Sequence, residues 1–160
     1  MIKITHEALQ TIHHHAEATF PEECCGFLAS PGLDEIVTEP IECANIQNKL
    51  HEEDPVEYPR TAKDAYVIDG MEIYAVDKSV SEKGHHLVGT YHSHTDKDAY
   101  FSEEDRRLAT FEGGPIWSAA HYIVVSVMGG KVAYAKSFQW DPEKKDFMEE
   151  EMDVLEKKQA

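Results

Sequence analysis

Length, composition and charge already limit what this chain can be. Its 160 residues include 31 acidic and 15 basic side chains, which gives a formal net charge of −16. We therefore expect one domain spanning 1–160 with one ordinary core, and no binding to nucleic acid, because this charge repels phosphate. No run approaches the roughly 18 apolar residues of a membrane helix, and the N-terminus lacks the apolar stretch of a signal peptide.

The cysteines indicate a reducing compartment. The chain has three of them, an odd number, and two are adjacent, which does not suit a disulfide framework. We therefore expect a cytoplasmic protein with no membrane partner. Cys24 and Cys25 precede an apolar strand, where alternation predicts that one of the two is buried as a small apolar residue; a redox role is the alternative.

The first half of the chain predicts a helix, two strands and an irregular segment. Residues 5–19 have helical spacing with Thr5 as N-cap, and the three histidines at 13–15 inside this helix spread over about 200° of its surface. They cannot converge on one metal, so we assign them to solvent. Strands are predicted at 24–30 and 35–43. Residues 45–63 lack periodicity, and such a loop is either functional or a solvated excursion.

The second half predicts two further helices, three strands and a tail. Ile73, Val76 and Val80 would face the core from a helix at 69–83. A strand is predicted at 86–93 and a helix from Ser102 to Glu112. Strands 122–127 and 132–138 form a hairpin around Gly129-Gly130. In the tail at 145–160, residues 147–155 have a helical pattern, which predicts a short helix that is either docked or frayed.

These elements mix helices and strands without regular β-α-β alternation. The sequence therefore predicts an α+β or three-layer α/β fold, in which helices flank a mostly antiparallel central sheet.

The residues richest in chemistry follow the strand at 86–93. They read His92-Ser93-His94, then Ser102 and Asp105, which is H-S-H-x7-S-x2-D. Alternate side chains of a strand share a face, so His92 and His94 point the same way and Ser93 points the other way. Two imidazoles and a carboxylate from the next element leave one position open, as in catalytic zinc sites. The motif indicates a metalloenzyme.

Each half of the motif also has a simpler explanation. A chain with ten histidines often contains His-x-His by chance, and Ser102 to Asp105 reads as a helix capping box. The two halves together, at this spacing and after a strand, favour a metal site, in which Ser102 can both cap the helix and serve the chemistry. The acidic neighbours fall outside ligand spacing and are assigned to solvated loop or first-turn charge: Asp96, Asp98, Glu103 and Glu104.

The motif resembles the signature of the JAMM (MPN-plus) zinc metallopeptidases. That family also requires an upstream Glu, commonly just before a Cys-Gly and an apolar strand, and Glu23 takes this position before Cys24-Cys25-Gly26. The similarity spans residues 1–140 and implies the three-layer architecture that the family shares with cytidine deaminases. The family often has Pro where this chain has Thr95 and Phe101, so the loop at 95–101 is expected to differ in shape and not in chemistry.

The resemblance implies a mechanism as well. His92, His94 and Asp105 would hold Zn²⁺ with water as the fourth ligand, whose pKa zinc lowers to about 7. Glu23 would accept the water proton as general base, and Ser102 would donate to the oxygen of the tetrahedral intermediate. Glu22 is assigned to the surface, because adjacent residues of an extended chain face opposite ways.

The resemblance finally implies a substrate. Members of the family cleave peptide or isopeptide bonds at the C-terminal tails of ubiquitin-like proteins, and small prokaryotic members resemble enzymes that act on ubiquitin-like sulfur carriers. Two other functions stay open. One is a zinc amidohydrolase of small amides, for which a narrower pocket is expected. The other is a non-catalytic scaffold domain, against which the complete ligand set and Glu23 argue.

Overall fold

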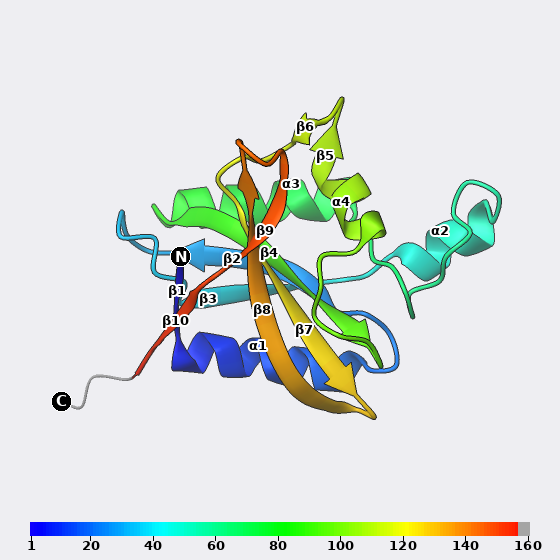
Figure 1. The fold of residues 1–160 in the computed structure, drawn as a ribbon, viewed down its shortest axis with the longest axis horizontal. Coiled ribbons are helices and arrows are strands. Elements are labelled where there is room, and N and C mark those ends of the chain that lie inside the picture. Colours follow the sequence, from blue (N-terminus) through cyan, green and yellow to red (C-terminus); the bar gives the residue numbers. More distant parts are fainter. Residues whose placement is uncertain (157–160) are drawn as a thin grey trace.

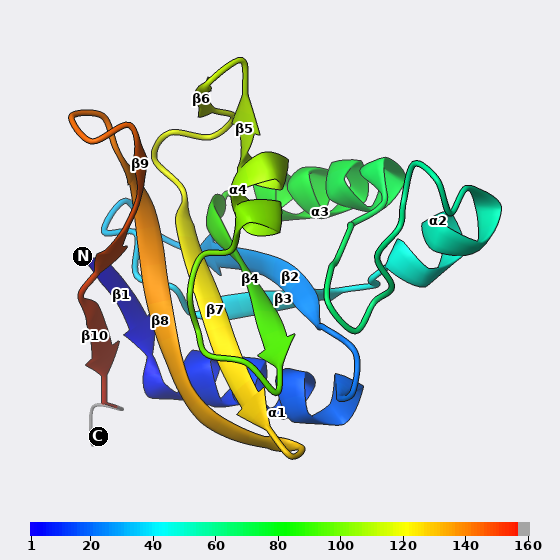
Figure 2. The same cartoon turned by 45° about the vertical axis from the view of Figure 1, so that its right-hand side comes forward.

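The computed structural model describes residues 1–156, and these form three layers around a six-stranded sheet. The helices are α1 (His6–Thr19), α2 (Gln47–Glu53), α3 (Gly70–Glu82) and α4 (Glu103–Ala109). Figures 1 and 2 show α1 on one face of the sheet, and α3 and α4 on the other. Within these residues, no helix combines the length and hydropathy needed to cross a membrane.

The central sheet is mostly antiparallel. Its strands, in spatial order, are β3 (Glu39–Cys43), β2 (Cys25–Ser30), β4 (His86–Thr95), β7 (His121–Met128), β8 (Lys131–Asp141) and β9 (Asp146–Glu150). Within this sheet, as far as residues 1–156 describe it, the β4–β7 pair alone is parallel, and α4 lies in the connection between these two strands. The predicted fold class is confirmed. Two small sheets are added by β1 (Ile2–Thr5) with β10 (Met152–Leu155), and by β5 (Thr110–Phe111) with β6 (Gly114–Pro115).

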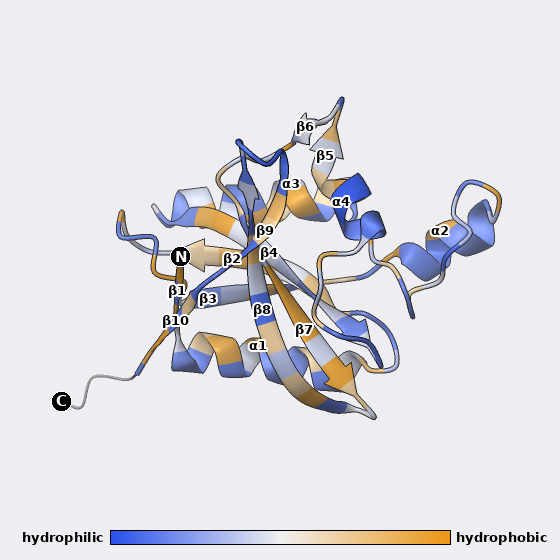
Figure 3. Ribbon diagram, viewed as in Figure 1, coloured by the Kyte–Doolittle hydropathy of each residue, from blue (hydrophilic) through white to orange (hydrophobic). Residues whose placement is uncertain are grey.

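Both faces of the central strands are buried, because helices cover both sides. Strand β2 is buried at all six positions, β7 is buried from His121 to Val127, and much of β7 has the orange of hydrophobic residues in Figure 3. Cys24 packs in the cluster beneath α1, and Cys25 in the cluster with Val76 and Val80 of α3. The prediction that only one of these cysteines is buried is therefore wrong, because it assumed a sheet with one wet face.

The N-terminal helix follows its prediction closely. The Thr5 hydroxyl caps α1 by accepting from the backbone N–H of Ala8 at 3.2 Å. His14 is exposed, but the assignment of its two neighbours to solvent is wrong. His13 is half-buried, and Nδ1 of His15 lies 2.8 Å from the hydroxyl of Tyr91, which is fully buried.

Several details of the predicted elements differ in the structure. The 35–43 strand begins only at Glu39, after a positive φ at Glu35, and the 45–63 segment contains α2, whose polar sequence hides its periodicity. Helix α4 ends at Ala109, because Glu112 and Gly113 take positive φ and turn the chain into the β5–β6 hairpin. In α3, Ile73 is 41% exposed and does not face the core.

The predicted tail helix at 147–155 is wrong. This segment forms β9 and β10, which pair with β8 and with β1. The side chain of Phe147 is buried among Phe101, Tyr122 and Trp140, and its backbone completes the hydrogen bonds of an otherwise open sheet edge. Long-range pairing therefore outweighed the helical spacing of the sequence. Residues 157–160 of the expected tail lie outside the described part of the chain.

Candidate metal centre

Strand pairing brings Glu23 and the two histidines to one edge of the sheet. Strand β2 runs antiparallel to β4 with Cys25 opposite His92, so the residues before β2 lie beside the end of β4. The pairing continues beyond β2, since Ser93 N–H donates to the carbonyl of Cys24 at 3.2 Å. His92, His94 and Glu23 are all buried, with exposed fractions of 0%, 2% and 3%.

Ser93 and Glu22 do not join the two histidines. The Ser93 hydroxyl accepts from the backbone N–H of Cys24 at 2.8 Å, as expected for a residue on the opposite face from His92 and His94. Glu22 lies at the surface, where its carboxylate accepts from the side-chain amide of Asn48 at 3.2 Å.

Asp105 reaches the histidines from the first turn of α4. The Ser102 hydroxyl accepts from Asp105 N–H at 3.0 Å, and Asp105 Oδ2 accepts from Ser102 N–H at 3.0 Å, which together form the expected capping box. The same Oδ2 lies 3.1 Å from Nε2 of His92 and 3.2 Å from Nε2 of His94. The capping explanation and the metal-site explanation of this motif therefore describe one arrangement.

The geometry of these three side chains fits a small cation. The two imidazole Nε2 atoms are 3.3 Å apart, so the three candidate ligand atoms form a nearly equilateral triangle. In a tetrahedral zinc site with bonds of about 2.0–2.1 Å, neighbouring ligand atoms are about 3.3 Å apart. Nδ1 of His94 lies 2.8 Å from the carbonyl of Asp98, which can only accept, so Nδ1 carries the proton and Nε2 presents a lone pair. Lone pairs converging on one buried point fit a zinc ion.

Burial and charge perturb both carboxylates of this centre. Burial acts to raise the pKa of Asp105, but the two adjacent imidazoles of His92 and His94 outweigh it, and the pKa is lowered. The Glu23 carboxyl behaves in the opposite way. Its burial, followed by the negative charge of Asp105, raises its pKa well above the ordinary value. A buried carboxyl with a raised pKa binds a proton more readily than an exposed one, which is the property required of a general base.

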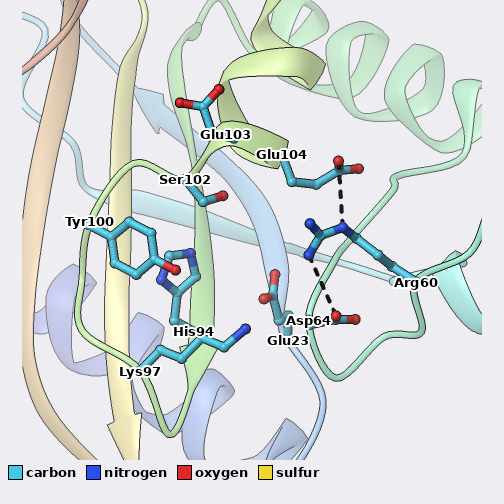
Figure 4. A pocket seen from close by; sticks show the side chains of 9 residues that line it. All are labelled: Glu23, Arg60, Asp64, His94, Lys97, Tyr100, Ser102, Glu103 and Glu104. Carbon is cyan, nitrogen blue, oxygen red and sulfur yellow. Dashed lines mark ion pairs between the residues drawn. The ribbon is translucent and has the colours of Figure 1, made fainter.

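A cavity of about 210 Å³ opens beside this centre, and Figure 4 shows Glu23, His94 and Ser102 on its walls. The other lining side chains are Arg60, Asp64, Lys97, Tyr100, Glu103 and Glu104. Ser102 uses its oxygen to cap α4, which leaves its hydroxyl hydrogen available to a molecule in the cavity. Glu103 and Glu104 also line the cavity. They therefore lie closer to the site than expected from their assignment to solvated first-turn charge.

The loop at 95–101 is held without the prolines that the family often has. The Thr95 hydroxyl donates to the carbonyl of Lys63 at 2.6 Å, and Ser126 donates to the carbonyl of Lys97 at 2.6 Å. The Phe101 ring packs against Tyr122, Phe138 and Phe147. Side-chain hydrogen bonds and aromatic packing thus fix the segment that places the carbonyl of Asp98 beside Nδ1 of His94.

Several neighbours of the site were not identified from the sequence. Asn45 donates to the carbonyl of Glu23 at 2.9 Å, and Ala62 accepts from the N–H of Glu23 at 2.7 Å. The Tyr66 ring stacks on His92, with ring centroids 4.5 Å apart. All three lie between β3 and α3. The length of the 45–63 segment was the signal in the sequence that pointed to Asn45 and Ala62, and no signal pointed to Tyr66.

Residues 5–141 match the family described as prokaryotic homologs of the JAB domain. The chain belongs to this family. This match confirms the resemblance to the JAMM (MPN-plus) class that the motif indicated. No curated protein matches the chain.

Solved structures share the JAB-domain fold seen here. A protein from Desulfitobacterium hafniense has a TM-score of 0.75 at 23% identity, covering 98% of this chain and 94% of its own. A protein from Salinibacter ruber has a TM-score of 0.64 at 25% identity, covering 96% and 92%. A JAB1/MPN domain protein from Archaeoglobus fulgidus has a TM-score of 0.56 at 20% identity, covering 96% and 97%. The sequence of this JAB-domain chain has diverged much further than its fold.

Proposed function

We propose that this protein is a zinc-dependent hydrolase that cleaves a peptide or isopeptide bond at the C-terminal tail of a ubiquitin-like or sulfur-carrier protein. The observation that carries the proposal is the convergence of His92, His94 and Asp105 on one point, within 4.8 Å of one another. Glu23 and Ser102 line the cavity beside that point. Family membership supports the class of reaction, and the reduced state of all three cysteines is compatible with a cytoplasmic location.

The chain's own residues supply acid–base and electrostatic chemistry. Zinc bound at the three ligands would lower the pKa of a water molecule to about 7 and polarise the substrate carbonyl. Glu23 accepts the proton of the attacking water and returns it to the leaving amine. Ser102 donates its free hydroxyl hydrogen to the carbonyl oxygen as negative charge develops there.

The cavity restricts what can reach these groups. Its volume of about 210 Å³ is below the range of about 300–1,000 Å³ that is usual for pockets that enclose a small ligand. A narrow tail of small residues in an extended conformation suits such a space, because the rest of the substrate stays outside. The same small volume favours the second candidate function, hydrolysis of small amides, so the test includes both substrates.

The test compares two neighbouring carboxylates in the zinc-loaded protein. Glu23→Gln is expected to keep zinc and lower kcat by about 10²–10⁴ on a carrier protein with a cleavable residue after its Gly-Gly tail. Glu22→Gln is the matched control and should retain wild-type kcat, because Glu22 lies at the surface against Asn48.

Each alternative function predicts a different result. Wild-type activity in Glu23→Gln would refute the assigned base. Efficient cleavage of a small amide without cleavage of any tailed carrier would replace the proposed substrate with the second candidate. No hydrolysis of either by the zinc-loaded wild type would identify a scaffold domain.

A further inference from the structure

The two candidate histidine ligands are held in different ways. Nδ1 of His94 lies 2.8 Å from the carbonyl of Asp98. Nδ1 of His92 is fully buried, and among residues 1–156 it has no hydrogen-bond partner. Histidines that bind metals almost always use the second nitrogen in a hydrogen bond that fixes the orientation of the ring. The orientation of His92 therefore needs another source.

Tyr66 provides a flat surface for the His92 ring. The two ring centroids are 4.5 Å apart and the planes are inclined by 25°, which is a stacked arrangement. A stacked pair prevents the imidazole from tilting about its own bonds, although it contributes no hydrogen bond. The edge of His92 that carries Nε2 stays directed at His94 and Asp105, at 3.3 and 3.1 Å.

Tyr66 is itself held in place from both sides. The side-chain amide of Asn45 donates to the carbonyl of Ala65 at 3.1 Å and accepts from the N–H of Val67 at 3.2 Å. The same Nδ2 atom donates to the carbonyl of Glu23 at 2.9 Å. One amide therefore fixes the backbone on both sides of Tyr66 and the backbone of the proposed base.

Behind Tyr66 lies a mostly apolar cavity of about 380 Å³. Tyr66 lines it together with Phe27, Ile68, Leu108, Trp117 and Tyr122 among others. The Tyr66 side chain thus contacts both this space and His92. Removal of the ring would leave the imidazole beside a void, where nothing prevents it from rotating away from the ligand geometry.

We infer that Tyr66, fixed by Asn45, is a positioning residue for His92, and that its ring face replaces the second hydrogen bond of this metal ligand. The inference rests on the proposed function, since it concerns the affinity of the same site for zinc. It assigns a role to the irregular segment after β3 that does not involve contact with the substrate.

The test measures zinc affinity by competition with a chromophoric chelator. Tyr66→Leu should weaken zinc binding by about 10–100-fold, the usual cost of losing a residue that orients a ligand. Tyr66→Phe keeps the ring face and should remain within about threefold of the wild type. Tyr74→Leu is the matched control, because Tyr74 is 65% exposed on α3, and it should bind zinc as the wild type does.

The melting temperature of each metal-free variant separates positioning from folding. A structural role alone would lower this temperature in Tyr66→Leu without changing zinc affinity. If Tyr66→Leu does not fold, Tyr66→Met carries the same comparison, because its flexible side chain adapts to the space without providing a ring face.

Three outcomes would overturn the inference. Wild-type zinc affinity in the folded Leu or Met variant would show that the ring face is not needed, and the proposed function would survive. An equal loss in Tyr66→Phe would assign the effect to the hydroxyl group. If the wild-type protein binds no zinc, the proposed function fails and this inference fails with it.

Discussion

One carboxylate oxygen of Asp105 takes part both in the cap of α4 and in the candidate metal centre. Oδ2 accepts from the N–H of Ser102 at the start of α4 and lies 3.1 Å from Nε2 of His92. The helix cannot begin one residue earlier or later without moving this oxygen, because each residue turns a helix by about 100°. The capping box therefore sets the position of the third candidate ligand.

Ser102 should show both roles when its hydroxyl is removed. We expect Ser102→Ala to lower kcat by about 10²–10³, the usual cost of losing one donor to a developing negative oxygen. It should also destabilise the protein by about 1 kcal/mol through loss of the cap. Thr5→Ala is the control, because Thr5 makes the same capping bond at α1, on the other face of the sheet.

Enzyme assays and urea unfolding together measure both effects. Thr5→Ala should show a similar loss of stability with unchanged kcat. Similar kcat values in the two variants would mean that Ser102 only caps its helix.

The sequence could bring the candidate metal ligands together because the motif is local. His92 and His94 share a face through strand alternation, and Ser102 and Asp105 share a turn through helix geometry. The contribution of Glu23 depends on strand pairing and was identified only through the family resemblance. Tyr66 and Asn45 could not be identified, because their positions depend on the path of an aperiodic segment through the folded structure.

At the scale of elements, the last strand of the central sheet is tied to its interior by a buried carboxylate. Oε2 of Glu150 on β9 lies 2.7 Å from Nδ1 of His121 on β7 and 3.0 Å from the hydroxyl of Ser137 on β8. Burial acts to raise the pKa of Glu150, but the hydrogen bond and charge of His121 and the hydrogen bond of Ser137 outweigh it, and the pKa is lowered.

This lowered pKa predicts a stability that depends on pH. A carboxyl group whose pKa is lower in the folded than in the unfolded state stabilises the fold above its ordinary value of 4.5, and the contribution is lost as the pH falls through the folded value. We expect Glu150→Gln to lower the free energy of unfolding by about 2 kcal/mol at pH 7 and by much less at pH 3.

Urea titrations at the two pH values measure this difference. Glu149→Gln is the control, because Glu149 is 56% exposed in an ion pair with Lys136, and such pairs contribute less than about 1 kcal/mol. A Glu150→Gln effect of equal size at both pH values would contradict the account.

The irregular segment after β3 divides into a supporting part and an exposed tip. Asn45, Ala62 and Tyr66 contact the site from its two ends, whereas Val56 near the tip is 90% exposed. Figure 2 shows α2 and this tip projecting beyond the sheet. We expect this tip to contact the body of a protein substrate.

Replacing residues 55–57 with two glycines should therefore raise KM for a tailed carrier protein several-fold. The KM for a short Gly-Gly peptide should stay near the wild-type value, because the supporting residues are unchanged. Steady-state kinetics on the two substrates test this. Equal effects on both would mean that the tip supports the fold or the site and does not recognise the partner.

At the scale of the whole molecule, the layered architecture could be predicted from the sequence, but the pairing of its strands could not. The mixture of helical and extended patterns, without regular β-α-β alternation, indicated the layers. The parallel β4–β7 and β1–β10 pairs join residues far apart in the sequence, which local periodicity does not encode. The same layers bury the candidate metal centre at the end of β4, in the connection to α4, so the site is built on fixed elements.

The central claim is that the three buried side chains form one zinc site, and calorimetric titration of the metal-free protein with zinc tests it most directly. We predict one tightly bound zinc per chain, with binding abolished in His92→Ala and in His94→Ala and unchanged in His14→Ala, an exposed histidine of α1. Circular dichroism of each variant would show that the fold is retained. Absence of zinc binding in the wild type, or undiminished binding in folded His92→Ala and His94→Ala, would contradict the claim.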